Sequence, residues 1–382
     1  HGRSGLHRLP LGRAGGRRPG LYKPEDFCAV SDIAADGHGG FVVTEWLSAP
    51  RRTARFDGDG KLLREWYGGQ QFYTFAAPEP GNPNLVWMDS QWGWLMQAEV
   101  DYEKRDWKVR ACYQWAEHLD QFWIGAGKMA SRMHPIKRGT ETLLWFENNP
   151  GLLLRVDETN GALLPVAMLG NNKGANLTNN LPPVWADALE KSQPSLSGKR
   201  DRRGWTGYSW ADANNDGAMQ ADELRLLSPA VHKNGHGFAV WGGARAVDEQ
   251  LNLYTTARYG PYNGLWVKYP AQGYTARGWP IWDWSRGESG PQLDDIHGAD
   301  SLALLKDGGV VSLHRGGGDK YVARDTYSPG HGWQWPANQT DGVGLCRWDA
   351  QGRKLWQVGT KAARRESMPG QLHYPVRISS EL

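Results

Sequence analysis

One twelve-residue segment, residues 212–223, combines residue types and spacing that suit one kind of chemistry. Oxygen-bearing groups recur at its positions one, three, five, seven, nine and twelve: Asp212, Asn214, Asp216, the backbone carbonyl of Ala218, Gln220 and Glu223. Gly217, at position six, permits the sharp turn that brings these groups together. A calcium ion takes six to eight oxygen ligands and is closed at position twelve by a bidentate carboxylate. The segment therefore predicts a Ca²⁺ site.

An Asp/Asn-rich turn without a metal is the alternative, because such side chains commonly satisfy turn backbone groups. The three carboxylates at ligand positions, those of Asp212, Asp216 and Glu223, would repel one another without a cation, which favours the metal. Mg²⁺ suits the segment less, since it demands octahedral geometry and tends to keep its waters. The loop offers a complete set of ligands with no open position, so we expect a structural rather than a catalytic ion.

The flanks of the loop predict an insertion between strands, at about residues 205–228. Residues 204–210 read as a strand, and residues 219–227 could form a short exiting helix. The loop is similar to the isolated DxNxDG loops, of EF-hand type, that occur in extracellular bacterial proteins. That resemblance implies a structural calcium site rather than a sensor that opens a pair of helices.

Short β-rich runs separated by Gly, Asp, Asn and Pro dominate the rest of the chain. Strand–turn–strand patterns occupy residues 33–44, 53–66, 302–313 and 345–356, and weaker copies lie between them. The Asp-Gly steps in the turns supply the positive φ angles of tight hairpins. Groups of four such strands at intervals of about 40 to 60 residues are typical of β-propeller blades.

Two segments carry a resemblance to known propellers. Asp57–Trp66 resembles the outer hairpin of NHL-type propellers, and Trp348–Trp356 is similar to quinoprotein-like blades. The resemblance implies an all-β fold: a six- or seven-bladed β-propeller of four-stranded antiparallel blades, forming a single domain over residues 1–382. The end segments, 5–9 and 374–379, predict either closure of the ring through its two ends or a chain that is part of a longer protein.

Candidate catalytic residues lie where innermost strands are expected to begin. Asp32, His236, Asp295 and His297 would converge there if their segments align. Arg258 beside Tyr259 could neutralise a uronate and assist proton abstraction, as in several polysaccharide lyases. Capping of turns by Asp and His, and stacking of Arg on Tyr, are the structural alternatives. No three-histidine metal set, nucleophile elbow or phosphate loop is present in the sequence.

The chain holds 21 tryptophans, an unusual density. Exposed rings would form stacking platforms for sugars, whereas buried rings would pack the core. The candidates for sugar binding are Trp205, Trp210, Trp279, Trp282, Trp333 and Trp335. Alternating positions such as 282/284 and 333/335 place two rings on one strand face, which suits core packing equally well.

Composition limits the function classes. The net charge of +3 indicates no nucleic-acid partner, and no apolar run approaches the roughly 18 residues of a membrane span. Three widely spaced cysteines give no disulfide framework. We expect a secreted, periplasmic or cell-surface protein that binds carbohydrate or a surface partner. One form of this hypothesis makes the chain part of a larger assembly. A polysaccharide lyase or hydrolase and a purely structural module are the alternatives, because a fold does not decide among them.

Overall fold

The computed structural model of this chain describes residues 13–14, 16–46, 50–68, 76–89, 94–115, 132–147, 151–171, 207–227, 246–255, 266–283, 286–291, 301–314, 326–328, 332–334 and 344–358. Within this part of the chain the regular elements are β-strands and one 3₁₀ helix at Ala221–Glu223. No described helix is long and apolar enough to cross a membrane. The chain divides into two compact units, residues 1–144 with 154–165, and residues 145–153 with 166–382.

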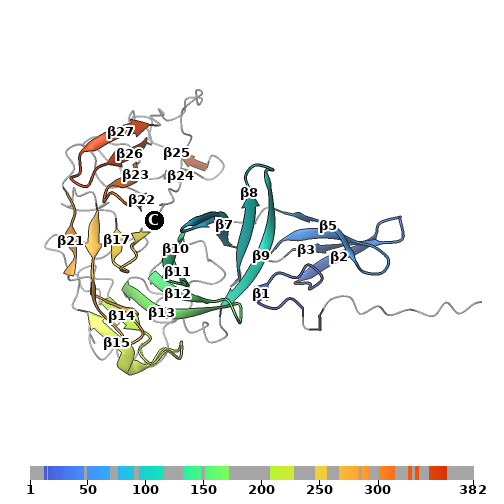
Figure 1. The fold of residues 1–382 in the computed structure, drawn as a ribbon, viewed down its shortest axis with the longest axis horizontal. Helices are drawn as coiled ribbons and strands as arrows, with labels where there is room; N and C mark the ends of the chain where they lie inside the picture. Colours follow the sequence, from blue (N-terminus) through green and yellow to red (C-terminus); the bar gives the residue numbers. More distant parts are fainter. Residues whose placement is uncertain are drawn as a thin grey trace, which may run out of the picture. The chain divides into compact units, whose positions relative to one another are not determined.

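The first sheet of the chain is a four-stranded antiparallel meander (Figure 1). Its strands follow the sequence order and are β2 (Val30–Ala35), β3 (Phe41–Glu45), β4 (Arg52–Phe56) and β5 (Leu62–Tyr67). Along β3 and β4 the buried and partly exposed positions alternate, so each strand places one face in the core. The predicted hairpins at residues 33–44 and 53–66 are thereby confirmed.

A second antiparallel meander follows and leads into a third set of strands. The meander contains β6 (Ala76–Glu79), β7 (Asn82–Asp89), β8 (Trp94–Asp101) and β9 (Asp106–Trp115). The next strands are β10 (Arg132–Arg138), β11 (Glu141–Glu147), β12 (Gly151–Asp157) and β13 (Ala162–Asn171), and they neighbour one another in that order. Residues 162–163 of β13 pair in parallel with β9, and the short strand β1 (Gly20–Leu21) pairs with β9 as well.

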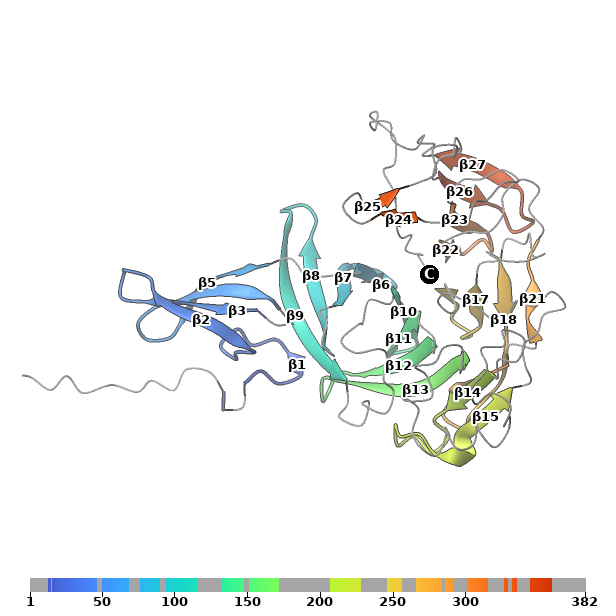
Figure 2. The ribbon, with the colours of Figure 1, turned by 180° about the vertical axis from the view of Figure 1, so that it is seen from behind.

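Later parts of the chain repeat the four-stranded pattern. One antiparallel sheet holds β16 (Ala246–Val247), β17 (Leu253–Thr255), β18 (Val267–Tyr269) and β21 (Glu288–Ser289). Another holds β22 (Ser301–Leu304), β23 (Val310–His314), β26 (Gly344–Trp348) and β27 (Lys354–Val358). Two-strand hairpins pair β19 (Ala271–Tyr274) with β20 (Pro280–Trp282), and β24 (Thr326–Ser328) with β25 (Gly332–Gln334). Figure 2 shows β18 beside β21, and β26 beside β27.

A five-residue turn recurs between the strands of these sheets. Its first residue donates its backbone N–H to the carbonyl of the fifth, as Asp57 does to Lys61 at 3.0 Å. Its fourth residue has a positive φ, between 62° and 86°. The turns occupy residues 36–40, 57–61, 248–252, 275–279, 305–309 and 349–353. Glycine takes the fourth position in all of them except the turn with Leu251, because only glycine adopts this backbone without strain.

An aspartate begins most of these turns and holds them closed. Oδ1 of Asp57 accepts the N–H groups of Asp59 and Lys61 at 3.0 and 2.8 Å. Oδ1 of Asp349 makes the equivalent bonds to residues 351 and 353. The Asp and the Gly of the repeated sequence pattern thus have separate jobs, since one satisfies backbone donors and the other supplies the left-handed residue.

Neighbouring sheets pack through aromatic side chains. In the first unit the rings of Tyr67 on β5 and Trp107 on β9 lie 4.6 Å apart. In the second unit a buried cluster joins Ala246 of β16 to Leu302, Val310 and Trp348 of the β22–β27 sheet. Sheets that bury one another face to face, each with its own tight hairpins, are what a blade requires.

The predicted fold class, all-β with four-stranded antiparallel sheets, is confirmed by these described strands. The weaker β-rich runs at residues 143–146, 152–164 and 246–255 also coincide with strands. The end segments 5–9 and 374–379 lie outside the described residues. The blade count of six or seven and the single domain over residues 1–382 stay predictions.

Candidate functional site

The predicted calcium loop is the connection of a β-hairpin. It joins β14 (Gly207–Ala211), which pairs with β13, to β15 (Leu224–Leu227). Trp210 and Leu224 are opposite each other in the ladder, so residues 212–223 leave and re-enter the sheet at one place. The strand before the loop is confirmed. The exiting helix expected over residues 219–227 is wrong, because only Ala221–Glu223 form a 3₁₀ turn and β15 follows at once.

The loop backbone turns its polar side chains inward. Two left-handed residues, Asn215 with φ of 64° and Gly217 with φ of 72°, produce the tight curvature. Oδ2 of Asp212 accepts the N–H of Gly217 at 3.0 Å. Oδ1 of Asn214 accepts the N–H of Asp216 at 2.9 Å. The side-chain oxygens at positions one and three therefore lie on the inside of the turn, beside position five.

Position twelve reaches back across the loop to its beginning. Oε1 of Glu223 accepts the backbone N–H of Ala213 at 2.7 Å. Oε2 of Glu223 accepts the indole N–H of Trp210 at 2.9 Å, and that ring is buried. Glu223, the last residue of the loop, is thus hydrogen-bonded to Trp210 and Ala213, on either side of the first residue of the loop. These two bonds hold the ends of the twelve-residue segment together.

The acids of the loop interact electrostatically. Burial raises the pKa of the Asp212 carboxyl, and the negative charges of Glu223 and Asp216 raise it further, while N–H groups of the loop oppose them. Gln220 donates from Nε2 to Oδ2 of Asp216 at 2.6 Å, and Asn214 donates to the same oxygen at 3.0 Å. A desolvated carboxylate with two like charges nearby is a site that a cation would stabilise.

The donor set fits Ca²⁺. Among the described residues no three His, Cys, Asp or Glu side chains are grouped so as to hold a metal by themselves. An oxygen set of the calcium type does not need them to, since amide and backbone carbonyl oxygens supply part of it. The amide of Gln220, whose Nε2 donates to Asp216, would have to present its oxygen to the ion instead, and Ala218 would add its carbonyl.

A second candidate site is a cleft of about 320 Å³ on the β2–β5 sheet. Its lining residues are Ser31, Thr44, Glu45, Trp46, Arg51, Arg52, Thr53 and Gly68. Thr44 and Thr53 are direct cross-strand partners, so their side chains stand on the same sheet face. Ser31, in a bulge of β2, lies 2.8 Å from the Thr44 hydroxyl (Oγ to Oγ1). The cleft thus presents three hydroxyl side chains.

Two tryptophans on this sheet are exposed to solvent. Trp46 is one of the residues that line the cleft, and it is 50% exposed. Trp66 pairs with Thr53 across β4 and β5 and is 44% exposed. Neither was singled out from the sequence. The alternation along residues 41–46 and 53–66, combined with the hairpin register, is the signal that would have placed them on the outer face.

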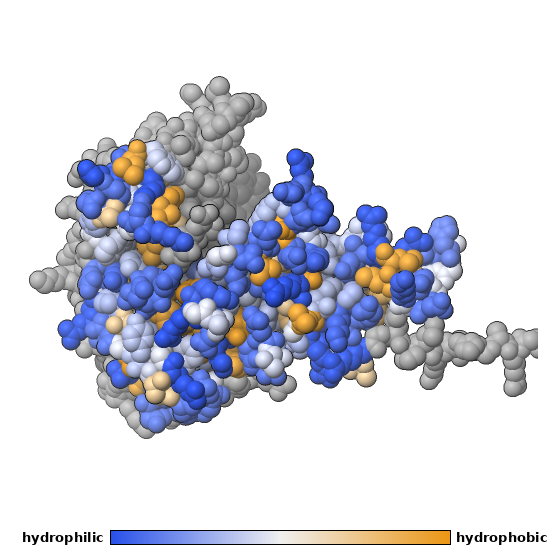
Figure 3. All heavy atoms as spheres, viewed as in Figure 1, coloured by the Kyte–Doolittle hydropathy of each residue, from blue (hydrophilic) through white to orange (hydrophobic). Residues whose placement is uncertain are grey.

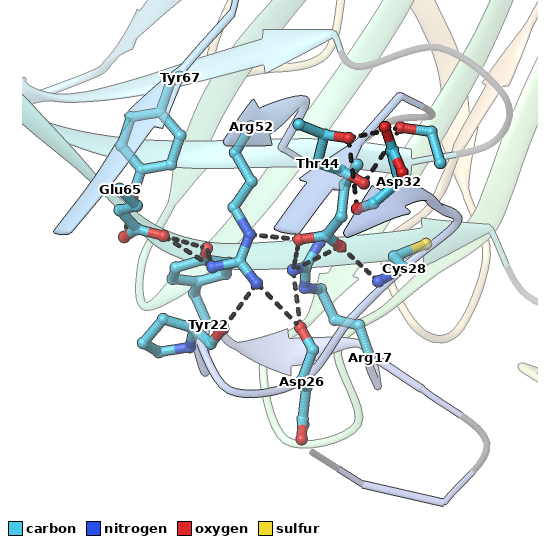
Figure 4. A network of polar contacts seen from close by, with 12 residues as sticks. Arg17, Tyr22, Asp26, Cys28, Asp32, Thr44, Arg52, Glu65 and Tyr67 are labelled. Atoms are coloured by element: carbon cyan, nitrogen blue, oxygen red, sulfur yellow. Dashed lines mark hydrogen bonds and ion pairs between the residues drawn. The ribbon is translucent and has the colours of Figure 1, made fainter. Parts of the chain in front are cut away.

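The opposite face of the same sheet is filled by a buried network of charges (Figure 4). Glu45 binds the guanidinium groups of both Arg17 and Arg52, and these side chains are almost completely buried. Arg52 also bonds to Glu65 at 2.7 Å and to the hydroxyl of Tyr22 at 2.6 Å. Burial raises the pKa of the Tyr22 hydroxyl, so that group stays protonated. Glu45 and Arg52 therefore line the cleft, but their charges are neutralised by ion pairs on the opposite face of the sheet.

Three of the tryptophans proposed for sugar binding are core residues in this structure. Trp210, Trp279 and Trp282 are 1%, 3% and 0% exposed. Trp282 stacks edge-on against Trp145 with 5.5 Å between ring centroids, and its indole donates to the Leu251 carbonyl at 2.8 Å. Rings enclosed in this way present no face to a ligand, which favours the core-packing alternative for them.

The remaining candidates lie outside what the structure describes. Trp333 falls within β25, but its side chain is not among those described. Residues 205, 236, 258, 259, 295, 297 and 335 belong to the undescribed segments. Trp205, Trp335, His236, His297, Asp295, Arg258 and Tyr259 therefore stay predictions. Asp32 is described and is an exposed residue of β2.

Comparison with known proteins found matches of low identity among solved structures. No family model and no curated protein matches the chain. Among solved structures it is similar to a protein from Lactobacillus plantarum (11% identity, 85% of this chain and 83% of that one, TM-score 0.32). It is also similar to the Dos1 propeller (10%, 91% and 75%, TM-score 0.29). A third is the dihydro-heme d1 dehydrogenase NirN in complex with DHE (13%, 93% and 81%, TM-score 0.25).

Proposed function

We propose that this chain is a β-propeller-type protein that binds carbohydrate, with one calcium ion stabilising the hairpin of β14 and β15. One observation carries the binding proposal. The half-exposed ring of Trp46 borders a cleft that also presents the hydroxyls of Ser31, Thr44 and Thr53. The apolar face of a sugar ring can stack on an indole, while hydroxyl side chains donate to and accept from sugar hydroxyls.

The architecture of the first sheet supports a pre-formed site. The cleft residues stand on strands, and the strands are tied from behind by the Glu45 network. A binding group held on a strand by packing and hydrogen bonds loses little freedom when ligand arrives. The polar partners of the cleft are therefore in place before binding.

Calcium at residues 212–223 supports an extracellular, periplasmic or cell-surface location. Loops of this kind in extracellular modules bind Ca²⁺ with Kd on the order of 10⁻⁴–10⁻³ M, which suits the calcium concentration outside cells. A polysaccharide or a cell-surface glycan is the corresponding partner. The calcium ion would be held by Asp212, Asn214, Asp216, Ala218, Gln220 and Glu223, and it would supply charge neutralisation to the loop.

A glycan array followed by product analysis tests the binding proposal. We expect wild-type protein to retain a defined set of glycans without cleaving them, and Trp46→Ala to lose about two- to ten-fold in affinity, because stacking on a ring is worth about 0.5–1.5 kcal/mol. Trp356→Ala is the matched control, since that ring is 44% exposed on β27 and does not line the cleft. Absence of glycan binding, or equal loss in both variants, would contradict the proposal.

A further inference from the structure

The charges around the β2–β5 cleft are unevenly paired. Arg55 forms an ion pair with Asp36 at 2.8 Å, and Arg64 lies over the ring of Trp66, with its guanidinium carbon 5.1 Å from the ring centroid. On the inner face, Arg17 and Arg52 are engaged by Glu45. Each of these arginines already has a partner within the sheet.

Arg51 differs from the others. Its side chain lines the cleft and is partly exposed, and within the described part of the chain it forms no ion pair or side-chain hydrogen bond. Its stem runs beside Gly68, where a Cβ would meet Arg51 Cδ at 3.6 Å. The absence of a side chain at Gly68 leaves this edge of the cleft open next to the guanidinium.

The acids near the cleft do not neutralise Arg51. The carboxylate of Glu45 is buried and shared by two arginines behind the sheet. Asp32 on β2 is exposed, and its Oδ1 accepts the backbone N–H of Ile33 at 2.8 Å. The charged residues that line the cleft are Glu45, Arg51 and Arg52, and the first and last of these belong to the buried network, so Arg51 contributes the positive charge that the cleft presents.

We propose that the cleft selects an acidic sugar, a uronic acid residue whose carboxylate pairs with Arg51 while its ring stacks on Trp46. This inference rests on the proposed carbohydrate binding and names the class of sugar that the same cleft prefers. A guanidinium can bind a carboxylate through two parallel N–H···O bonds, which a neutral sugar cannot accept in the same way. Thr44, Thr53 and Ser31 are then available to the ring hydroxyls.

The test compares matched oligosaccharides by isothermal titration calorimetry with the full chain. The ligands are an oligouronate, the neutral oligosaccharide of the same length and linkage, and a sulfated version of the neutral one. We expect the oligouronate to bind about ten- to a hundred-fold more tightly than its neutral counterpart, the range set by charged hydrogen bonds. Arg51→Gln should abolish this difference, because it should weaken binding of the oligouronate far more than binding of the neutral oligosaccharide.

Three controls make the result specific. Arg64→Gln removes a positive charge from the same face without touching the cleft and should change the preference little. Arg51→Lys keeps the charge but not the bidentate geometry and should keep part of the preference. Equal affinity of the sulfated ligand would mean that Arg51 reads charge rather than a carboxylate, which overturns the uronate assignment.

Failure of this inference is distinguishable from failure of the proposed function. If wild-type protein binds none of the oligosaccharides, both are overturned. If it binds neutral and acidic ligands equally, and Trp46→Ala weakens both, carbohydrate binding stands and the preference for an acidic sugar is overturned. Unchanged melting temperatures of the Arg51 variants show that any loss comes from the cleft rather than from unfolding.

Discussion

Asp212 is the residue on which the calcium loop depends most. It is 2% exposed, and burial together with two neighbouring acids raises its pKa. A buried carboxylate in this position is costly to leave charged, unless a cation or enough N–H donors compensate it. The bonds from Asp216 and Gly217 supply part of that compensation. A calcium ion would supply the remainder.

The raised pKa of Asp212 predicts a pH dependence. In the metal-free chain, the stability that Asp212 contributes is fully present at pH values below its unfolded-state pKa of about 3.8. It is lost as the pH rises through the higher pKa of the folded state. Calcium requires the deprotonated carboxylate of Asp212. The stabilising effect of calcium should therefore grow as the pH rises through the same interval, from the unfolded-state to the folded-state pKa. We therefore expect the calcium-induced rise in melting temperature to be larger at pH 7 than at pH 4.5. A rise that is independent of pH would contradict this role.

The Asp212→Asn variant should affect the metal-free and the calcium-bound forms of the loop differently. Without calcium the variant should be as stable as wild type or more so, because the buried charge and its repulsion disappear. With calcium it should lose the added stability. Chemical denaturation with and without chelator measures both, and a variant that is destabilised equally under the two conditions would indicate a purely structural aspartate.

Substitution of Glu45, unlike that of Asp212, should destabilise the chain whether or not calcium is present. Glu45→Ala leaves Arg17 and Arg52 buried without their common partner, and we expect a loss of about 3–5 kcal/mol in the free energy of unfolding. Lys104→Ala is the control, since its ion pair with Asp101 is exposed and should contribute nothing measurable. Equal effects in denaturant titrations would mean that the buried network adds no stability.

The sequence could predict the tight turn of residues 212–223 because its polar residues are contiguous and its conformation depends on local turn chemistry, whereas the calcium ion itself stays a prediction. It could not predict Trp46 and Arg51 as cleft residues. Their exposure follows from the pairing of four strands and from the packing of the opposite face, both of which join residues far apart in the chain. Trp210 and Trp282 show the converse, since nothing local distinguishes a buried ring from an exposed one.

At the element scale, the five-residue turn sets the register of the hairpins. Gly39→Ala tests it cleanly, because φ there is 86° and an added Cβ would meet nothing within 4 Å. We expect a loss of about 1–2 kcal/mol from the left-handed backbone alone. Gly273→Ala, which also meets nothing within 4 Å but has no positive φ, should be neutral or slightly stabilising. Equal effects in thermal unfolding would rule out the turn as the cause.

The elements also show where local sequence reasoning ends. Strands were predictable from alternation and from Asp-Gly turns, and the described strands agree. The end of the predicted calcium loop was not, because residues 219–227 have helix-compatible composition, but residues 224–227 pair as β15 with β14. Tertiary pairing overrides a short helical preference, since a single turn of helix has little stability of its own.

At the scale of the whole molecule, repeated four-stranded sheets bury their faces against one another within each unit. Their existence follows from the sequence, because each meander is local. The number of blades, and the choice between ring closure through segments 5–9 and 374–379 and a chain that is part of a longer protein, depend on contacts between parts that are distant in the chain. These properties cannot be read from strand patterns, and they stay predictions.

Calcium should raise the stability of the fold by mass action. With Kd on the order of 10⁻⁴–10⁻³ M and roughly 10 mM Ca²⁺, the expected gain is about 1.4–2.7 kcal/mol. Because β14 pairs with β13 as well as with β15, a tightened loop secures two strand pairings together. Differential scanning calorimetry should show a higher melting temperature in calcium than in chelator, and Mg²⁺ at the same concentration should give a smaller shift.

The most direct test of the account is a calorimetric titration of Ca²⁺ into the metal-free chain and into the Asp216→Ala variant. The side chain at this position accepts bonds from both Asn214 and Gln220 at the centre of the loop, so its loss removes the middle of the ligand set. We predict one equivalent of bound calcium for wild type and none for the variant. No calcium binding by wild type, or the same binding by both proteins, would contradict the account.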